Sequence, residues 1–346
     1  MRSRWFRLVL LGVLPMGGSV MSAGCSSTGR GDGELVARMA RVGAERHGLR
    51  VEITPAIDRV TFFGPSEGEN LLHVTDLERP LPSDGGYTFW GGCYTWVSPQ
   101  KEPSGQAGAG LGWVAADGTK KDWPPDPAMD VGPLRRTGAG PGWIELLGPE
   151  QRSGLQEFKR FEVLAPDLAE FAYTLRNRGR ANVAAGAWIN TALGGEDVIA
   201  LRMPAGTEVY GWSPTAVTLF KSILSESDAR GWRTLDLSRA KWSNGIKVYI
   251  APPAGEGLAA VEIAVWRRAA RRWMHRTLGP MSAADVSRLR GAGEGPVAVY
   301  IQPGDEPIIE AELYGPISDL APGSETRVVE RWRVIGAEQA RTAMLP

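Results

Sequence analysis

Apolar and polar residues alternate in many short runs along this chain, which is the pattern of half-buried β-strands. Between Leu49 and Thr54 every second residue is a large aliphatic one, and Pro55 ends the run. Similar short runs predict further strands at 57–63, 71–74, 143–147, 161–163, 171–175, 183–191, 198–203, 217–224, 247–250, 261–266, 297–301, 309–313 and 328–334. Short turns, such as the one expected at 177–180, join several of these runs without a helix between them. The order therefore predicts an antiparallel sheet.

Helical patterns are limited to two short segments. Residues 34–46 place Leu35, Met39 and Val42 on one helical face, and Ser282 followed by Asp285 resembles a capping box that starts a helix reaching Leu289. No repeat of fixed period is present. Many short strands with little helix predict an all-β, mainly antiparallel sandwich from about residue 48 to residue 337.

Composition narrows the class of partner and of chemistry. The 346 residues include 39 basic and 39 acidic side chains, a balance that gives no electrostatic reason to expect a nucleic acid. The 44 glycines and 25 prolines favour turns over helices. The sequence contains no Walker loop, dinucleotide fingerprint, zinc-binding His-Glu-x-x-His or nucleophile elbow. We therefore expect no cofactor and no metal.

The first residues have the pattern of an export signal. Arg2 and Arg4 precede a short apolar run at 8–14, and Ser22 begins a stretch of small residues that ends in Cys25. This resembles the lipobox of bacterial lipoproteins, in which the cysteine is lipid-modified, although a larger aliphatic residue usually stands where Ser22 is. An ordinary secretory signal is the alternative. We expect a signal peptide at 1–24, a tether and short helix at 25–47, and a sandwich domain at 48–346, anchored to a membrane on the periplasmic or cell-surface side.

If Cys25 carries lipid, Cys93 is the only other cysteine and has no partner for a disulfide. No Cys/His spacing supports a nucleophile. A small buried apolar residue is the expected role of Cys93.

An aromatic block between two glycine pairs is the best candidate for a binding site. Residues 85–100 hold several rings, and residues 123–126 add another ring beside a stiff proline pair. A sugar needs an aromatic plane for its C–H face and polar groups for its hydroxyls, so the expected ligand-binding residues are Trp90, Trp96, Gln100, Trp123, Asp126, Trp188 and Asn190. The alternative is an aromatic core.

Two charged groups offer further chemistry. Glu310 and Glu312 lie two residues apart and so share one strand face, where they could divide acid and base roles, or simply face solvent. We take Glu310 as the best catalytic candidate. The arginines between 267 and 276 around Trp273 could bind an anion, or form a solvated basic face.

Several separated blocks together resemble an uncharacterised bacterial family, the one labelled domain of unknown function 4380. They are 53–60, 69–72, 91–92 with Trp96 and 99–100, 123–125, 173–177, 188–191, 315–316 with 320–323, and 330–332. The resemblance covers most of the chain after the tether, and only the order of the blocks makes it specific. It implies a fold similar to the galactose mutarotase-like superfamily, a β-supersandwich with a carbohydrate-binding cleft on one sheet.

Sugar mutarotases use a glutamate base and histidine acids. This chain has only His47, His73 and His275, with no paired-histidine motif, so mutarotase chemistry is not expected. The first hypothesis is an exported lipoprotein that binds a carbohydrate or cell-envelope glycan. The alternatives are a carbohydrate-active enzyme (epimerase, lyase or hydrolase) that uses carboxylates, and a structural envelope protein with a vestigial cleft.

Overall fold

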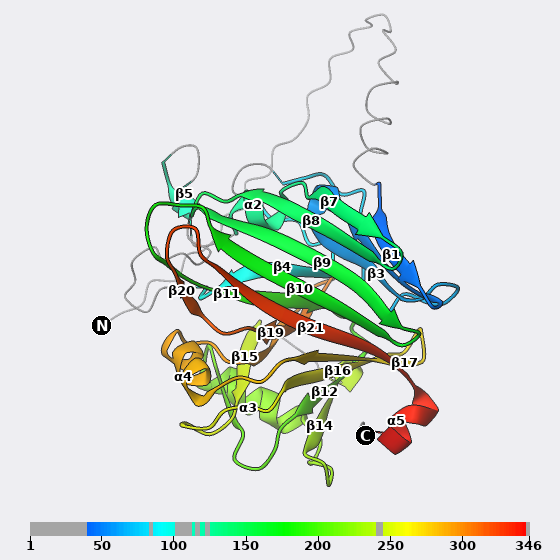
Figure 1. Cartoon of the computed structure of the whole chain (residues 1–346). Helices are drawn as coiled ribbons and strands as arrows, with labels where there is room; N and C mark the ends of the chain where they lie inside the picture. Colours follow the sequence, from blue (N-terminus) through cyan, green and yellow to red (C-terminus); the bar gives the residue numbers. More distant parts are fainter. Residues whose placement is uncertain are drawn as a thin grey trace, which may run out of the picture.

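Two large antiparallel sheets pack face to face (Figure 1). The computed structural model describes residues 40–82, 86–100, 113–114, 118–121, 125–239 and 245–343. The first sheet runs in the order β1(Val42–Arg46), β2(Leu49–Thr54), β3(Arg59–Pro65), β4(Cys93–Ser98), β11(Val183–Ala192), β19(Ile308–Tyr314), β18(Val297–Gln302), β15(Ile246–Ala251), β13(Glu208–Gly211). A further short strand, β20(Ser318–Leu320), pairs with β11.

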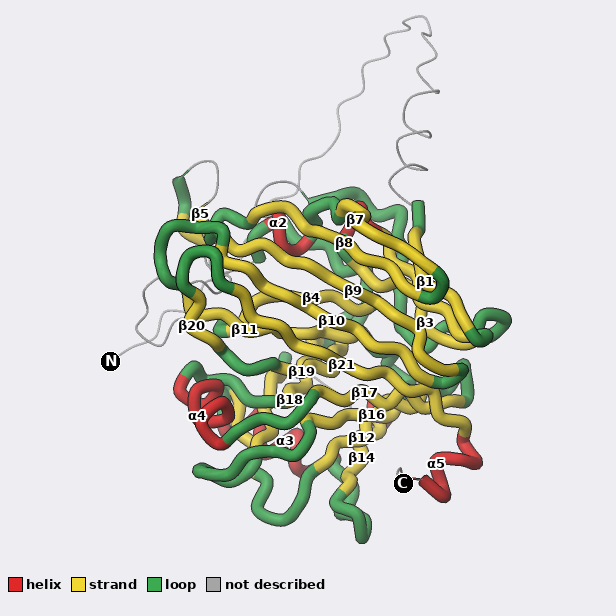
Figure 2. The backbone as a smooth tube through the Cα atoms, viewed as in Figure 1, coloured by secondary structure: helices red, strands yellow, loops and turns green. Residues whose placement is uncertain are grey.

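The second sheet forms the other layer and lies in front in Figures 1 and 2. Its order is β14(Trp232–Asp236), β12(Val198–Arg202), β16(Val261–Arg267), β17(Arg272–Leu278), β21(Glu325–Gly336), β10(Leu168–Asn177), β9(Leu155–Ala165), β8(Trp143–Glu150), β7(Arg135–Gly140). A separate two-stranded ribbon consists of β5(Trp113–Val114) and β6(Lys120–Lys121).

The helices are short pieces at the margins of the sheets (Figure 2). They are α2(Pro127–Asp130), α3(Pro214–Ile223), α4(Ala283–Gly291) and α5(Ala337–Ala343), with 3-10 turns η1(Pro55–Ile57) and η2(Leu237–Arg239). The capping box predicted for α4 is confirmed, because Ser282 and Asp285 bond each other's backbone N–H groups. Within the described residues, none of these helices has the length and apolar character needed to span a bilayer.

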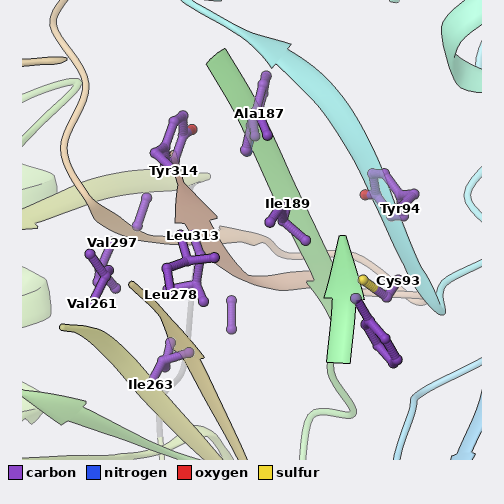
Figure 3. Packing of buried hydrophobic residues seen from close by; sticks show 14 of the residues in the cluster. Cys93, Tyr94, Ala187, Ile189, Val261, Ile263, Leu278, Val297, Leu313 and Tyr314 are labelled. Atoms are coloured by element: carbon purple, nitrogen blue, oxygen red, sulfur yellow. The ribbon is translucent and has the colours of Figure 1, made fainter. Parts of the chain in front are cut away.

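The main core fills the space between the two sheets. Ile189 of β11 and Leu313 of β19 belong to one buried cluster with Ile263 of β16 and Leu278 of β17, as Figure 3 shows. Along β11 the neighbouring residues point to the opposite face, because side chains alternate across a strand. Residues on both faces of the first sheet are therefore buried, and the face that points away from the second sheet contributes Trp96, Trp188 and Tyr314 to the cluster.

The helix predicted at 34–46 is wrong where the structure describes it. Val42–Arg46 form strand β1, which pairs with β2 through a tight turn at His47 (φ 57°) and Gly48 (φ 76°). Two successive residues with positive φ form the turn type that joins hairpin strands. Sheet pairing thus overrides the helical pattern, and the sandwich begins at Val42 rather than at residue 48. Residues 34–39 of the predicted helix lie outside the described residues.

Two of the predicted strands are also wrong. Residues 217–224 fall mostly in helix α3, which starts at Pro214 and is capped by the Ser213 hydroxyl accepting from the Ala216 N–H. A proline at the first helical position and a serine cap start a helix whatever the apolar content that follows. The run at 71–74 forms only an isolated bridge between Val74 and Gly91.

Cys93 is a buried free thiol, as predicted. The arginine-rich segment 267–276 lies on the β16–β17 hairpin, where Arg268, Arg271 and Arg272 are exposed while Arg267 and Arg276 are buried. Arg276 is fully buried against Glu330, with Nε 2.6 Å from Oε1, while Arg267 pairs with Asp197. These guanidinium groups are already neutralised by partners on neighbouring elements.

Candidate functional site

The face of the first sheet that points away from the second sheet carries a row of aromatic rings, which belong to the same buried cluster as the residues between the sheets. Trp96 of β4 lies opposite Trp188 of β11, which lies opposite Tyr314 of β19. The Trp96 and Trp188 ring centroids are 5.0 Å apart at 79°, and those of Trp188 and Tyr314 are 5.5 Å apart at 14°. All three rings are buried. Edge-to-face and offset-stacked contacts of this kind hold a rigid aromatic wall.

The adjacent row across the same three strands carries polar groups. Tyr94 lies opposite Asn190, which lies opposite Glu312. Glu312 Oε2 accepts hydrogen bonds from Trp188 Nε1 (2.7 Å) and the Tyr314 hydroxyl (2.7 Å), and lies 2.9 Å from Lys247 Nζ. Its other oxygen, and Oδ1 of Asn190, are buried with no hydrogen-bond partner in the described structure. Two neighbouring acceptors are therefore unused.

Glu310 lies one row further along β19 and is also buried. Its carboxylate accepts a hydrogen bond from the Tyr94 hydroxyl. Burial and the negative charge of Glu312 raise the pKa of Glu310 from 4.5 to about 7. A carboxyl group that titrates near neutral pH can both donate and accept a proton under physiological conditions.

An ion pair fixes the β4 end of this face. Asp130 of α2 accepts from Arg59 Nη2 (2.6 Å) and from Trp96 Nε1 (3.1 Å). The Arg59 guanidinium lies 4.1 Å from the centroid of the Tyr94 ring. Burial lowers the pKa of Arg59, but the charge of Asp130 outweighs burial and the net pKa is raised. Arg59 therefore stays charged and holds Tyr94 and Trp96 in place.

Glu294 joins the loop after β4 to the same region. Its carboxylate accepts from the Ser98 hydroxyl and from the backbone N–H of Gln100 at 2.6 Å. Burial raises the pKa of Glu294 above its ordinary value. With Asp130, Glu310 and Glu312, this makes four buried carboxylates at the face.

The β13–β15–β18 edge of the face is open. Trp212, directly after β13, is 60 % exposed and packs edge-on against Tyr300 with ring centroids 5.7 Å apart. Tyr300 lies opposite Glu310 in the β18–β19 register. Burial and the negative charge of Glu310 raise the pKa of Tyr300 to about 12. The exposed Trp212 ring therefore packs on the half-buried Tyr300, which lies next to the buried Glu310.

The structure brings together four of the predicted site residues: Trp96, Trp188, Asn190 and Glu310. Gln100 borders them through its backbone bond to Glu294. Trp123 lies outside the described residues.

Trp90 and Asp126 have other contacts. Trp90 packs in a separate small cluster with Ile57 and Leu77, and its ring centroid is 5.6 Å from the Arg59 guanidinium. Asp126 is the N-cap of α2, and its two oxygens accept from the backbone N–H groups of Ala128 and Arg152. A capping carboxylate with both oxygens engaged has a structural role at that position.

Sequence reasoning missed Trp212, Tyr300, Lys247 and Arg59. The sequence does place Tyr300 on the face of its strand opposite to Val299 and Ile301, because side chains alternate along a strand. The pairing of β18 with β19 then puts this ring on the same side of the sheet as Glu310. Arg59 is the first residue of β3 and Lys247 the second residue of β15, and a charge at such a position is easily taken for the boundary of a strand. Trp212 stands in a turn, and only the pairing of β13 with β15 brings it to this face.

The three histidines lie apart from the residues of this face that are described above. None of the hydrogen bonds and ion pairs given above involves a histidine, and His275 lies on the second sheet, 3.4 Å from Glu262. Among the described residues, no group of three or more histidine, cysteine, aspartate or glutamate side chains has a metal-binding arrangement.

Comparison with known proteins gives structural neighbours only. No family model matches the chain, so membership of the family labelled domain of unknown function 4380 is not confirmed. No curated protein matches either. Among solved structures, the Slr1438 protein of Synechocystis sp. PCC 6803 has a TM-score of 0.50 at 9 % identity, over 86 % of this chain and 96 % of that chain.

Two further solved structures carry descriptive names. A galactose mutarotase-like protein from Lactobacillus casei has a TM-score of 0.49 at 11 % identity, over 85 % of this chain and 100 % of that chain. The galactose 1-epimerase of Lactobacillus acidophilus has a TM-score of 0.45 at 12 % identity, over 86 % of this chain and 94 % of that chain. The predicted fold class is confirmed. The described residues form two large antiparallel sheets with a few short helices, which is the all-β class that the sequence predicts.

Proposed function

We propose that the outer face of the first sheet binds a carbohydrate. Trp212 and Tyr300 supply the accessible rings on which a sugar stacks its C–H face. The buried carboxylates and amide behind them accept hydrogen bonds from its hydroxyl groups. The observation that carries the proposal is the contact of the exposed Trp212 with the half-buried Tyr300, which lies opposite Glu310.

The chemistry of the face favours a sugar over a purely apolar ligand. An apolar ligand would leave the unused acceptor oxygens of Asn190 and Glu312 unpaired in a buried site, which costs free energy. A sugar hydroxyl donates to such oxygens while its ring covers an aromatic side chain. The aromatic wall and the ion pairs hold these groups rigidly, which reduces the ordering cost of binding.

A glycan array with the purified full chain tests the proposal, followed by titration calorimetry with the best neutral oligosaccharide. Trp212→Ala should weaken binding about tenfold, because it removes the stacking surface. Trp212 is mostly exposed, so the urea midpoint should move little. Trp266→Ala, the same change on the second sheet, is the matched control. Absence of binding to every glycan would favour the structural envelope protein, and equal affinity in both variants would remove Trp212 from the binding site.

Glu310 supports a second candidate, a carbohydrate-active enzyme. Its pKa of about 7 and its contact with the Tyr94 hydroxyl suit proton transfer to or from a sugar oxygen. Incubating an array hit with the protein and following its proton NMR spectrum would reveal epimerisation, elimination or cleavage. Glu310→Gln should abolish any such change while the sugar still binds. A spectrum that stays constant with the wild-type protein leaves binding alone as the function.

We further propose that the protein is exported and anchored through lipid on Cys25, so that the bound carbohydrate belongs to the cell envelope or its surroundings. The small residues before Cys25 and the polar tether after it support this proposal. Both lie outside the described residues. Palmitate labelling of cells producing the wild-type protein and Cys25→Ser tests it, and equal labelling of the two would overturn it.

A further inference from the structure

A second, separate depression lies on the outer face of the other sheet. It has a volume of about 570 Å³ and crosses β8, β9, β10 and β21. No helix of the described chain passes in front of these strands in Figures 1 and 2. Pockets of roughly 300 to 1,000 Å³ are typical of small-molecule sites. Nothing in the proposed carbohydrate site uses this surface.

Small side chains hollow the sheet at this point. Ala172 and Thr174 of β10 form the floor and are almost completely buried. Thr174 lies opposite Phe158 of β9 on one side and opposite Arg327 of β21 on the other. Phe158 is itself opposite Leu147 of β8. The depression therefore has an apolar wall on one side and a guanidinium on the other.

The residues that line the depression include more arginines than glutamates. Arg176 pairs with Glu325, with Nη2 2.5 Å from Oε2, and Arg160 is engaged by Glu145 and Glu162. Arg178 and Arg327 also line the depression and are exposed, and neither guanidinium group has a hydrogen-bond or ion-pair partner in the described structure. Two guanidinium groups thus remain available at one end of a partly apolar hollow.

We propose that this groove binds an acidic saccharide, a sugar that carries a carboxylate or sulfate group. The fork of an arginine matches such an oxyanion with two parallel hydrogen bonds. The half-buried Phe158 ring and Leu147 cover the C–H face of the sugar. A simple inorganic anion would make no contact with Phe158 and Leu147. A long hydrocarbon chain would need a larger apolar surface than these two side chains provide.

Titration calorimetry of the full chain with digalacturonate tests the assignment, with lactose as the neutral disaccharide and sodium sulfate as the free anion. Digalacturonate should bind most tightly of the three. Its affinity should fall when the salt concentration is raised from about 0.05 to about 0.5 M, because this shortens the Debye length severalfold and screens the exposed charges. The double variant Arg178→Gln/Arg327→Gln should weaken binding at least about tenfold. Both side chains are exposed, so folding should be retained.

Arg331→Gln is the matched control, because Arg331 lies on the same face of β21 but outside the depression, paired with Glu170. It should leave digalacturonate binding unchanged. Trp212→Ala should also leave it unchanged, which separates this groove from the site on the first sheet. Equal weakening in the control, equal affinity for lactose, or sulfate binding as tight as digalacturonate would each overturn the assignment. Loss of digalacturonate binding in Trp212→Ala would instead place the acidic sugar at the first site.

Discussion

Replacing Glu310 by glutamine should change how the stability of the protein depends on pH. In the folded protein the pKa of Glu310 is raised from 4.5 to about 7 by burial and by Glu312. The folded state therefore keeps a proton that the unfolded chain releases. Since stability falls wherever the folded state binds more protons, this carboxyl group lowers the stability progressively between about pH 4.5 and pH 7.

The size of the effect follows from the shift. A difference between 4.5 and about 7 corresponds to about 3 kcal/mol of lost stability once the pH is above the folded pKa. Glutamine has nearly the same volume and its carbonyl can still accept from the Tyr94 hydroxyl, but it does not ionise. At pH 4.5 the free energy of unfolding of Glu310→Gln should be close to that of the wild type. At pH 8 the difference between the two proteins should have shifted by about 3 kcal/mol in favour of Glu310→Gln.

Urea unfolding of both proteins at intervals from pH 4.5 to 8.5 gives the measurement. Burial also raises the pKa of Glu157, to about 8, and that of Glu294. These groups are present in both proteins, so their contributions cancel in the difference. The carbon-13 carboxyl resonance missing from the Glu310→Gln spectrum identifies Glu310 and reports its titration directly. Stability curves that run parallel across the whole range would refute this reasoning.

Three further predictions concern the interior. Leu313→Ala should lower the free energy of unfolding by about 2–5 kcal/mol, because it opens a cavity between the sheets, and a urea midpoint that stays in place would contradict it. Arg276→Met should cost about 3–5 kcal/mol by leaving Glu330 charged and unpaired, and adding Glu330→Leu should restore part of the loss. Burial raises the pKa of the Cys93 thiol to about 11, so in a Cys25→Ser background iodoacetamide should label Cys93 at pH 8 only after unfolding. Rapid labelling of the folded protein would show that this thiol is accessible.

The sequence by itself determined most of the strands and the face on which each side chain lies. Alternation has a period of two residues, so Trp188 and Asn190 had to share one face of their strand, as did Glu310 and Glu312. The same local rules located the cap of α4. Such features depend on neighbours within a few residues, which the printed sequence shows directly.

Only the tertiary structure decided which strands meet. Trp188 and the Glu312 that binds its ring N–H are 124 positions apart, and Tyr94 and Glu310 are 216 positions apart. Residues 42–46 became a strand rather than a helix because β2 offered hydrogen-bond partners. Asp126 became a helix cap rather than part of the aromatic face. The environment that raises the pKa of Glu310, and the position of Trp212 beside Tyr300, arise from pairing between distant strands, and no local pattern encodes that pairing.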